Sequence, residues 1–484
     1  MQKTGKDTVV RGDSKLAIKV GFWYTLSTFL TRGIAFITTP IFSRIMTKSD
    51  YGEFSNYASW MATLLILVSA ELYNTLSRAY YDYKEDYGKY ISSIVICSCL
   101  SSVLFYALFL LSGSWIYRFV NIPPQYVHIM FFTMMCMSCR SVFLTREKTL
   151  YRYKNVVLIS ILGTLLPIII SVILVWKADS ADQLSARIYG FYVPSSMVGF
   201  TCACILIFQG RMFRWEHVRY ALKIAVPLLV NYLTVYLLTS TNVIITKSSF
   251  GADKAAIVSI STSVIHILTT LFQALSGALT TWIMDNLEQK NYGKLRREIF
   301  LYVIGISTLA LGVILLAPEV VLVLGGKSYL AAVELIPFLV LSVLIQSMMT
   351  VFTIILTYDK NIKITAIAAG IVAVVSILAK IWLLPVFSLQ SLSVINAIAF
   401  AVLFAVNYFL VHRAGYAGVI NIKGYTILIV FIGLICAFSF YFYNNSPARY
   451  ALIGAIGLCF CTFAFTNRQL FLSLLRRKKE LKER

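Results

Sequence analysis

Long apolar runs separated by short polar joints dominate the chain. A helix needs about 20 mostly apolar residues to cross the hydrocarbon core of a bilayer, and fourteen runs reach that length. They cover residues 20–41, 54–77, 91–112, 125–145, 156–176, 188–208, 224–246, 256–284, 299–324, 330–356, 364–385, 390–411, 425–443 and 450–466. The longest joints are Gln209–Lys223 and Asp285–Glu298, too short for a soluble catalytic domain. The pattern predicts an all-α polytopic membrane protein with about fourteen transmembrane helices.

The composition supports this class. Hydrophobic residues make up 59% of the 484 residues and charged residues 13%, whereas soluble domains average about 45–50% apolar and about 25% charged. So few charges exclude a soluble globular protein of this length. The net charge of +22 would suggest nucleic-acid binding in a soluble protein. In a membrane protein it indicates cytoplasmic loops rich in Lys and Arg.

The distribution of Lys and Arg predicts the orientation. If the N-terminus is cytoplasmic, 31 of the 43 basic residues lie in cytoplasmic segments and 9 in outer joints, while Arg32, Arg140 and Lys380 lie within spans. This bias predicts that both termini are cytoplasmic. The basic run Arg476–Lys482 then contacts anionic lipid headgroups rather than nucleic acid.

Three short motifs recur in order about 200 residues apart, each at the equivalent joint. The pairs are Thr47–Gly52 with Thr246–Gly251, Tyr87–Lys89 with Tyr292–Lys294, and Lys154–Asn155 with Lys360–Asn361. The repeat is six spans long, and because six is even both copies enter the membrane in the same direction, giving a parallel pseudo-two-fold repeat. We therefore predict an N-lobe of helices 1–6 (residues 1–220), a C-lobe of helices 7–12 (residues 221–412), and two appended helices with a basic tail (residues 413–484).

Polar side chains recur along the eighth span at steps of four and three residues, which places them on one helix face. They are Thr262, His266, Thr269, Gln273, Ser276 and Thr280. Hydrogen bonds between helices explain Ser and Thr alone, but His266 and Gln273 favour the wall of a wet cavity. His266 either titrates near neutral pH or is a structural residue. The seventh span adds Asn242 as a candidate cavity residue.

Charged residues inside spans are stronger candidates, because a charge at the bilayer centre costs about 2.5–3.5 kcal/mol and so faces a cavity or a partner. Arg32, near the middle of the first span, is predicted to line the cavity. Lys380 either binds a ligand or snorkels to the outer interface, and for Arg140 snorkelling is favoured. Glu71, toward the cytoplasmic end of the second span, either pairs with an arginine or carries a coupling H⁺ or Na⁺. A mainly cationic cavity favours an anionic substrate, and Arg suits phosphate best.

Two segments carry a family resemblance. Pro40–Gly52 is a proline followed by a short polar joint that ends in an aromatic residue and glycine, and Ser77–Tyr83 is a tyrosine-bearing loop. With fourteen spans in two lobes, the chain resembles the Wzx-type polysaccharide flippases of the multidrug/oligosaccharidyl-lipid/polysaccharide exporter superfamily. It departs from the family at Asn242-Val243, where many members have Asp-Arg, so a role resting on that pair does not carry over.

The resemblance implies a transporter rather than an enzyme. Its substrate would be a polyprenyl-diphosphate-linked oligosaccharide, such as the O-antigen unit of lipopolysaccharide, moved across the bacterial inner membrane by alternating access. Cationic cavity residues contact the diphosphate in related flippases; Arg32 matches them in span and character, and Lys380 matches less closely. The appended helices would form a groove for the lipid tail. The implied partners are the lipid-linked oligosaccharide, membrane lipids and other polysaccharide-assembly proteins.

Three other functions compete with this one. A multidrug exporter of the same superfamily predicts twelve spans and an acidic cavity. A membrane glycosyltransferase, ligase or polymerase predicts a sizeable outer loop. A passive scaffold in polysaccharide assembly requires no transport. We expect no catalytic residues and no cofactor beyond a coupling ion, H⁺ or Na⁺. The cysteine pairs, such as Cys136 and Cys139, lie inside predicted spans and indicate buried thiols rather than a metal site.

Overall fold

The computed structural model describes residues 23–24, 27, 33–34, 36–359 and 362–466. Within these ranges every regular element is an α-helix or a short 3-10 helix, which confirms the predicted all-α fold. The first described stretch of continuous helix covers residues 36–45.

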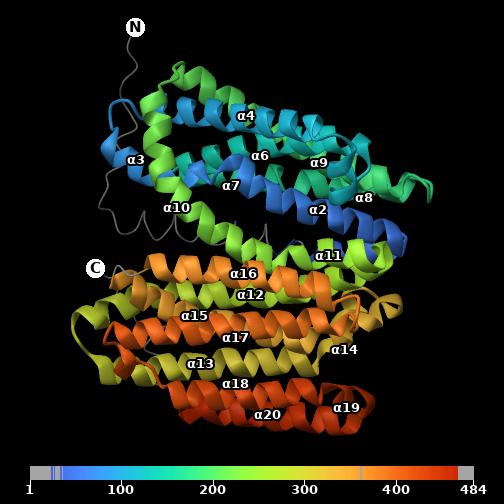
Figure 1. Cartoon of the computed structure of the whole chain (residues 1–484), viewed down its shortest axis with the longest axis vertical. Helices are drawn as coiled ribbons and strands as arrows, with labels where there is room; N and C mark the ends of the chain where they lie inside the picture. Colours follow the sequence, from blue (N-terminus) through green and yellow to red (C-terminus); the bar gives the residue numbers. More distant parts are fainter. Residues whose placement is uncertain (1–22, 25–26, 28–32, 35, 360–361, 467–484) are drawn as a thin grey trace.

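The helices form two groups that lie one above the other, with a smaller third group at the far side of the second (Figure 1). The first group, the N-lobe, contains α2 (Lys48–Ser69), η1 (Leu72–Thr75), α3 (Leu76–Asp82), α4 (Tyr87–Leu111), α5 (Gly113–Val120), α6 (Pro124–Thr149), α7 (Tyr153–Leu162), α8 (Leu165–Lys177) and α9 (Gln183–Gly210). The second group, the C-lobe, contains α11 (Thr241–Phe250), α12 (Ala252–Glu288), α13 (Tyr292–Leu315), α14 (Ala317–Leu324), η2 (Lys327–Glu334), α15 (Ile336–Tyr358), α16 (Ile362–Leu383), α17 (Gln390–Arg413) and η3 (Ala417–Val419). The third contains α18 (Ile422–Ala437), α19 (Ser439–Asn444) and α20 (Ser446–Thr466).

The connection between the lobes is α10 (Trp215–Thr239), which packs on η1 and α4 at one side and on α16 at the other. The arrangement agrees with two lobes and an appended set of helices. The lobe boundaries at residues 220 and 412 stay predictions.

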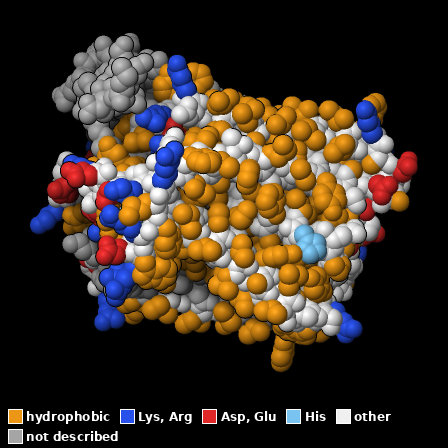
Figure 2. All heavy atoms as spheres, turned by 90° about the horizontal axis from the view of Figure 1, so that it is seen from above, with side chains coloured by type: hydrophobic (Ala, Val, Ile, Leu, Met, Phe, Trp, Pro, Cys, Tyr) orange, Lys and Arg blue, Asp and Glu red, His pale blue; other side chains and the backbone are white. Residues whose placement is uncertain are grey.

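The outer surface is that of a membrane protein. Nine helices within the described residues are long and apolar enough to cross a bilayer, and their positions match nine predicted spans. A broad band of hydrophobic side chains covers the middle of the face seen in Figure 2, and charged side chains gather at the two ends of this face. The second predicted span corresponds to α2, η1 and α3, and the seventh corresponds to α10 and α11. The thirteenth span corresponds to α18 and α19, and the fourteenth corresponds to α20.

Helix breaks inside the predicted spans are where the structure departs from the sequence prediction. The span at 156–176 is divided at Gly163 into α7 and α8. Pro167, four residues on, has no N–H and its ring opposes the Gly163 carbonyl, so the helix opens there. Arg140 of α6 donates a hydrogen bond from Nη1 to this carbonyl at 2.8 Å. The side chain thereby supplies the hydrogen bond that proline removed.

At two further helix breaks a side chain from another segment also donates a hydrogen bond to a backbone carbonyl. Pro318 divides the span at 299–324 into α13 and α14, and the carbonyl four residues before it, that of Ile314, accepts a hydrogen bond of 2.8 Å from the Tyr443 hydroxyl. The span at 224–246 is divided at Ser240 into α10 and α11. There the Leu238 carbonyl accepts a hydrogen bond of 3.3 Å from Lys380 of α16.

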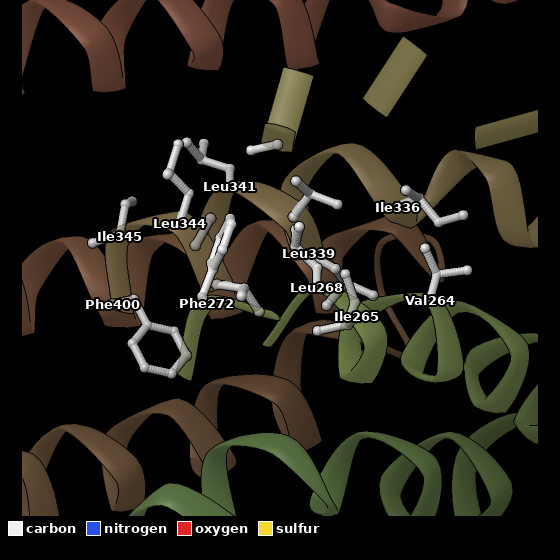
Figure 3. Packing of buried hydrophobic residues seen from close by; sticks show 14 of the residues in the cluster. Val264, Ile265, Leu268, Phe272, Ile336, Leu339, Leu341, Leu344, Ile345 and Phe400 are labelled. Carbon is white, nitrogen blue, oxygen red and sulfur yellow. The ribbon is translucent and has the colours of Figure 1, made fainter. Parts of the chain in front are cut away.

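The C-lobe core lies between α12 and α15. Val264, Ile265, Leu268 and Phe272 of α12 recur at steps of one, three and four residues and pack against α15 and α17 (Figure 3). Each of the four is 7% exposed or less. His266 and Thr269, which lie between them on the sequence, are thereby turned toward other sides of the helix. Burial of one face of α12 therefore sets which of its residues can face the other lobe.

The two lobes meet where α2 crosses α12. At Gly52 of α2 a Cβ atom would lie 1.9 Å from the Ala252 carbonyl oxygen at the start of α12, so only glycine allows this approach. One turn further, the Ser55 hydroxyl donates to the Ser259 hydroxyl at 2.8 Å. Nearby, Lys247 of α11 donates to the Glu53 carboxylate of α2 at 2.5 Å. These contacts join the lobes at the end of α2 nearest its N-terminus.

We predict that Gly52→Ala lowers the apparent midpoint of thermal unfolding of the detergent-solubilised protein. An extra methyl group against the Ala252 backbone forces the lobes apart, and such overpacking costs about 1–3 kcal/mol. The matched control is Gly305→Ala in α13, where a Cβ meets nothing within 4 Å. There alanine should leave the midpoint unchanged or raise it. Equal midpoints for the two variants would contradict the close approach of α2 and α12.

Candidate functional site

A cavity of about 290 Å³ lies between the lobes, and we call it the Arg187 cavity. The N-lobe helices α2 and α9 form one wall, together with the helical segment at 36–45, and the C-lobe helices α11 and α12 form the other. Its lining is Thr38, Thr39, Phe42, Tyr51, Phe54, Ser55, Ala58, Ser59, Ala62, Arg187, Ser240, Val243, Ser259, Thr262, Ser263 and His266. Half of these residues are Ser or Thr, so the wall is rich in hydroxyl groups.

Arg187 of α9 is the strongest charge in this cavity. The side chain is 8% exposed, and its guanidinium lies 3.5 Å from the ring centroid of Phe42 and 4.3 Å from that of Phe54. Nη1 donates to the Ser171 hydroxyl at 2.8 Å, while Nε has no hydrogen-bond partner. Aromatic faces stabilise a cation that has lost its water. Arg187 is thus held in place, while its Nε–H group has no hydrogen-bond acceptor.

The charge of the Arg187 cavity is positive. Of the described residues that line it, none carries a carboxylate, and His266 and Tyr51 are the other titratable residues of the lining. A planar guanidinium with a spare donor is suited to phosphate or carboxylate. Hydroxyl groups on both lobes are suited to the hydroxyls of a sugar. The arrangement can therefore hold an anionic, polyhydroxylated group.

A second cavity, of about 310 Å³, lies further along α2 toward its C-terminal end, and we call it the Glu71 cavity. It is enclosed mainly by N-lobe helices and by α10. Its lining is Ala58, Met61, Ala62, Leu65, Ile66, Ser69, Glu71, Tyr73, Met137, Ser138, Ser141, Phe191, Tyr192 and Tyr236. Ala58 and Ala62 line both cavities. The small side chains of α2 are thus shared by a cavity that contains an arginine and a cavity that contains an acid.

The sequence matches one family model. Residues 17–279, more than half of the chain, match the family described as polysaccharide biosynthesis protein. The chain belongs to this family. The match includes α2, α9 and most of α12, and with them Arg187, Glu71 and His266.

Solved structures share the fold of this polysaccharide biosynthesis protein. The lipid II flippase MurJ in an inward closed conformation has a TM-score of 0.69 and 14% identity, with 93% of this chain and 99% of that chain covered. A multidrug resistance MATE family transporter of the MOP superfamily in an inward-facing conformation has a TM-score of 0.62 and 12% identity, with 82% and 99% covered. No curated protein matches the sequence. At these identities the likeness establishes a shared fold.

The predicted site residues of this family member fall in different places. His266, a member of the polar stripe on the eighth span, lines the Arg187 cavity, and its role in substrate binding stays a prediction. Thr262 lies beside it, but Ser276, further along the stripe, hydrogen-bonds the Tyr302 hydroxyl at 2.9 Å and so faces the C-lobe. Gln273 lies between these two regions and is exposed. Arg32 lies outside the described residues.

Lys380 and Asn242 are brought together. The Lys380 side chain is fully buried and donates to Asn242 Oδ1 at 2.7 Å as well as to the Leu238 carbonyl. Lys380 therefore does not snorkel to a membrane interface. It joins α16 to the break between α10 and α11. A role for either residue in substrate binding stays a prediction.

Arg140 also does not snorkel, which overturns the interpretation favoured from its position near the inner end of its span. Besides the Gly163 carbonyl, Nη1 lies 3.4 Å from the Ser195 hydroxyl of α9. Arg140 thus joins three segments of the N-lobe, and it does not line either cavity. The reason is the carbonyl freed by Pro167, which offers a buried acceptor closer than the membrane surface.

The sequence analysis missed Arg187 because this residue directly precedes the sixth predicted span and was counted with the outer joint. In the structure α9 begins at Gln183, one turn earlier. The available signal was the spacing of Arg187 and Phe191, which places both on one face of a helix if the helix starts before 187. Phe42 and Phe54, the other aromatic partners, come from distant segments.

We predict that Lys380→Met and Asn242→Ala each lower the apparent midpoint of thermal unfolding. Each removes one partner of a buried hydrogen bond and leaves the other unsatisfied, which costs about 1–3 kcal/mol. The double variant should lose less than the sum of the two, because both changes remove the same interaction. The midpoints of the four proteins in detergent form a double-mutant cycle. Strictly additive losses would show that the two side chains do not interact.

Proposed function

We propose that this protein is a flippase that moves a polyprenyl-diphosphate-linked oligosaccharide across the bacterial inner membrane. The glycan is a repeat unit for polysaccharide assembly, of the kind found in lipopolysaccharide O-antigen. Membership of the polysaccharide biosynthesis family and the fold shared with MurJ support transport of a lipid-linked saccharide. Both termini lie on the cytoplasmic side in this proposal, as the distribution of Lys and Arg indicates.

The observation that carries the proposal is the chemistry of the Arg187 cavity. A buried arginine lines this cavity together with Ser and Thr hydroxyls contributed by both lobes, and its Nε has no hydrogen-bond partner. A diphosphate binds well to a guanidinium, and a sugar exchanges its water for hydroxyl partners. The polyprenyl chain needs no cavity because the bilayer itself is an apolar solvent for it.

The lobe contacts suggest how the substrate crosses. Polar contacts between the lobes gather near the N-terminus of α2, which the predicted orientation places at the outer side. The buried Lys247 ammonium donates to Glu53 and to the Asn121 carbonyl at 2.6 Å. Lys48 donates to the Ser328 carbonyl at 3.2 Å. Rocking of the lobes separates these few contacts and opens the Arg187 cavity to the outer side, which is alternating access.

We predict that Arg187→Ala slows clearance of the lipid-linked oligosaccharide by roughly tenfold to a hundredfold. A hydrogen bond to a charged group contributes about 1.5–3 kcal/mol, and about 1.4 kcal/mol changes a rate tenfold. Cells that lack the protein should accumulate the intermediate on the cytoplasmic side, and the wild-type chain should clear it. Arg187→Lys keeps the charge but loses the planar guanidinium with its parallel donors. We therefore expect this variant to clear the lipid-linked oligosaccharide at a rate between those of the wild type and Arg187→Ala.

The matched control is Arg118→Ala, which removes an exposed arginine from α5 and should clear the intermediate like the wild type. All variants are compared at equal amounts in the membrane. If no intermediate accumulates in the deletion strain, the flippase proposal is wrong. Increased sensitivity of that strain to cationic drugs, without accumulation, would favour a multidrug exporter instead. Full clearance by Arg187→Ala would remove Arg187 from the binding site.

A further inference from the structure

The acid in the Glu71 cavity has no role in binding a diphosphate, and the groups around it are suited to a different part of the substrate. We propose that the Glu71 cavity binds an uncharged sugar ring of the glycan, and that Glu71 excludes sugars that carry a carboxylate. The Glu71 cavity thereby selects the glycan by its charge. This inference rests on the proposed function, which supplies the lipid-linked saccharide.

The Glu71 carboxylate is too far from Arg187 to bind the same group of the substrate. The Arg187 guanidinium lies 4.3 Å from the Phe54 ring near the start of α2, whereas Glu71 follows the end of this helix at Ser69. The helix from Phe54 to Ser69 is about 22 Å long at about 1.5 Å per residue, which is much longer than a diphosphate. Two alanines of α2 line both cavities. An elongated ligand with its diphosphate beside Arg187 can therefore extend its sugars toward Glu71.

The backbone holds the Glu71 side chain in the cavity wall. Ala70 and Glu71, which join α2 to η1, have φ angles of 45° and 54°. Residues other than glycine rarely adopt this left-handed region, and such strain is concentrated at functional sites. The Glu71 N–H donates to the Ser69 hydroxyl at 3.2 Å, and the Asn74 amide donates to Glu71 Oε2 at 2.9 Å. The carboxylate is therefore held in position by the protein itself.

Glu71 can still accept hydrogen bonds from a ligand. The residue is 7% exposed, and the described residues supply no donor to its Oε1 atom. A carboxylate only accepts hydrogen bonds, and its burial is costly where donors are lacking. Sugar hydroxyls are such donors. A site with a buried acceptor of this kind favours a ligand that carries the matching hydroxyl over one that lacks it.

Aromatic side chains form much of the apolar part of this cavity. Phe191 and Tyr192 of α9 lie edge to face, with their ring centroids 5.0 Å apart. Both line the cavity together with Tyr73 of η1 and Tyr236 of α10. Pockets for small ligands combine aromatic walls with a few polar groups that orient the ligand. Aromatic rings pack on the apolar C–H face of a sugar, while its hydroxyls extend to the polar groups around it.

Two hydroxyl groups of α6 add to the polar side of the cavity. The Ser138 hydroxyl donates to the Met134 carbonyl at 2.9 Å, and the Ser141 hydroxyl donates to the Met137 carbonyl at 3.0 Å. Each hydroxyl proton is thus used within α6, and the oxygen atom keeps a lone pair that accepts a hydrogen bond. The Glu71 cavity therefore offers acceptors on two segments, as a ring with several O–H donors requires.

The charge of the Glu71 cavity excludes an acidic sugar. Of the described residues that line this cavity, none is Lys, Arg or His, so no lining cation offsets the charge of a second carboxylate. Like charges brought together in a binding site are strongly unfavourable, and a repulsive group of this kind is a common source of specificity. The Arg187 cavity has the opposite character, with an arginine and, within the described part of its lining, no carboxylate.

The test compares ligands that differ only in the charge of one sugar. Isothermal titration calorimetry measures the binding of short-chain, water-soluble polyprenyl diphosphates to the purified full-length chain in detergent. One ligand carries a short chain of glucose units, and the others carry the same chain with a single glucuronate at each position in turn. We expect the wild type to bind the neutral chain about tenfold more tightly than the chain whose glucuronate reaches Glu71. Glu71→Gln should bind these two ligands with similar Kd, because the repulsion is removed.

Three further variants serve as controls. Arg187→Ala should weaken the binding of every ligand and keep their order, since all of them carry the diphosphate. Glu85→Gln makes the same substitution at an exposed carboxylate in the joint before α4 and should bind like the wild type. Glu71→Asp keeps the charge and should still discriminate against the glucuronate, which keeps the test decisive even if Glu71→Gln folds poorly.

The outcomes separate this inference from the proposed function. If the wild type binds none of these lipids, the proposed function fails and this inference fails with it. If the wild type binds the neutral and acidic chains equally well, the inference is overturned while the flippase proposal stands. Discrimination that Glu71→Gln preserves in full also overturns the inference, because a group other than Glu71 then excludes the acidic sugar.

Discussion

The structure depends on satisfying backbone carbonyls where helices break inside the membrane. The bilayer core has no water to replace a lost hydrogen bond, so a break persists only where another group supplies the donor. Arg140 does this for Gly163, Tyr443 for Ile314 and Lys380 for Leu238. Each donor lies on a different segment from the break that it stabilises. These three hydrogen bonds therefore fix both the shape of the broken helix and the packing of its neighbour.

This constraint changes how the buried cations are interpreted. A charge inside a span faces a cavity or a partner, and for Arg140 and Lys380 the partner is the backbone of the protein itself. Arg187 differs, because its guanidinium is held by aromatic rings and one hydroxyl and keeps a donor without a partner. Arg140 and Lys380, which line neither cavity, thus maintain the fold, while Arg187 lines a cavity in which a ligand can bind.

The two cavities share part of α2 as a wall. Its small residues Ala58 and Ala62 line both of them, while Gly52 allows α2 to approach α12 closely. Residues of α2 thus line one cavity that contains Arg187 and another that contains Glu71. A movement of α2 relative to α12 alters both cavities at once.

Hydrophobic periodicity and the distribution of charge on the sequence determined the class of protein, the positions of the spans and the polar stripe that includes His266. These properties depend on local composition and on the 3.6-residue helical period, both of which are one-dimensional. The partners of Lys380 and Arg140, and the place of Arg187 beside Phe42 and Phe54, were decided only by the tertiary structure. They depend on the rotation of each helix about its axis and on contacts between different segments, from 23 residues apart for Arg140 with Gly163 to 138 residues apart for Lys380 with Asn242, which no local pattern contains.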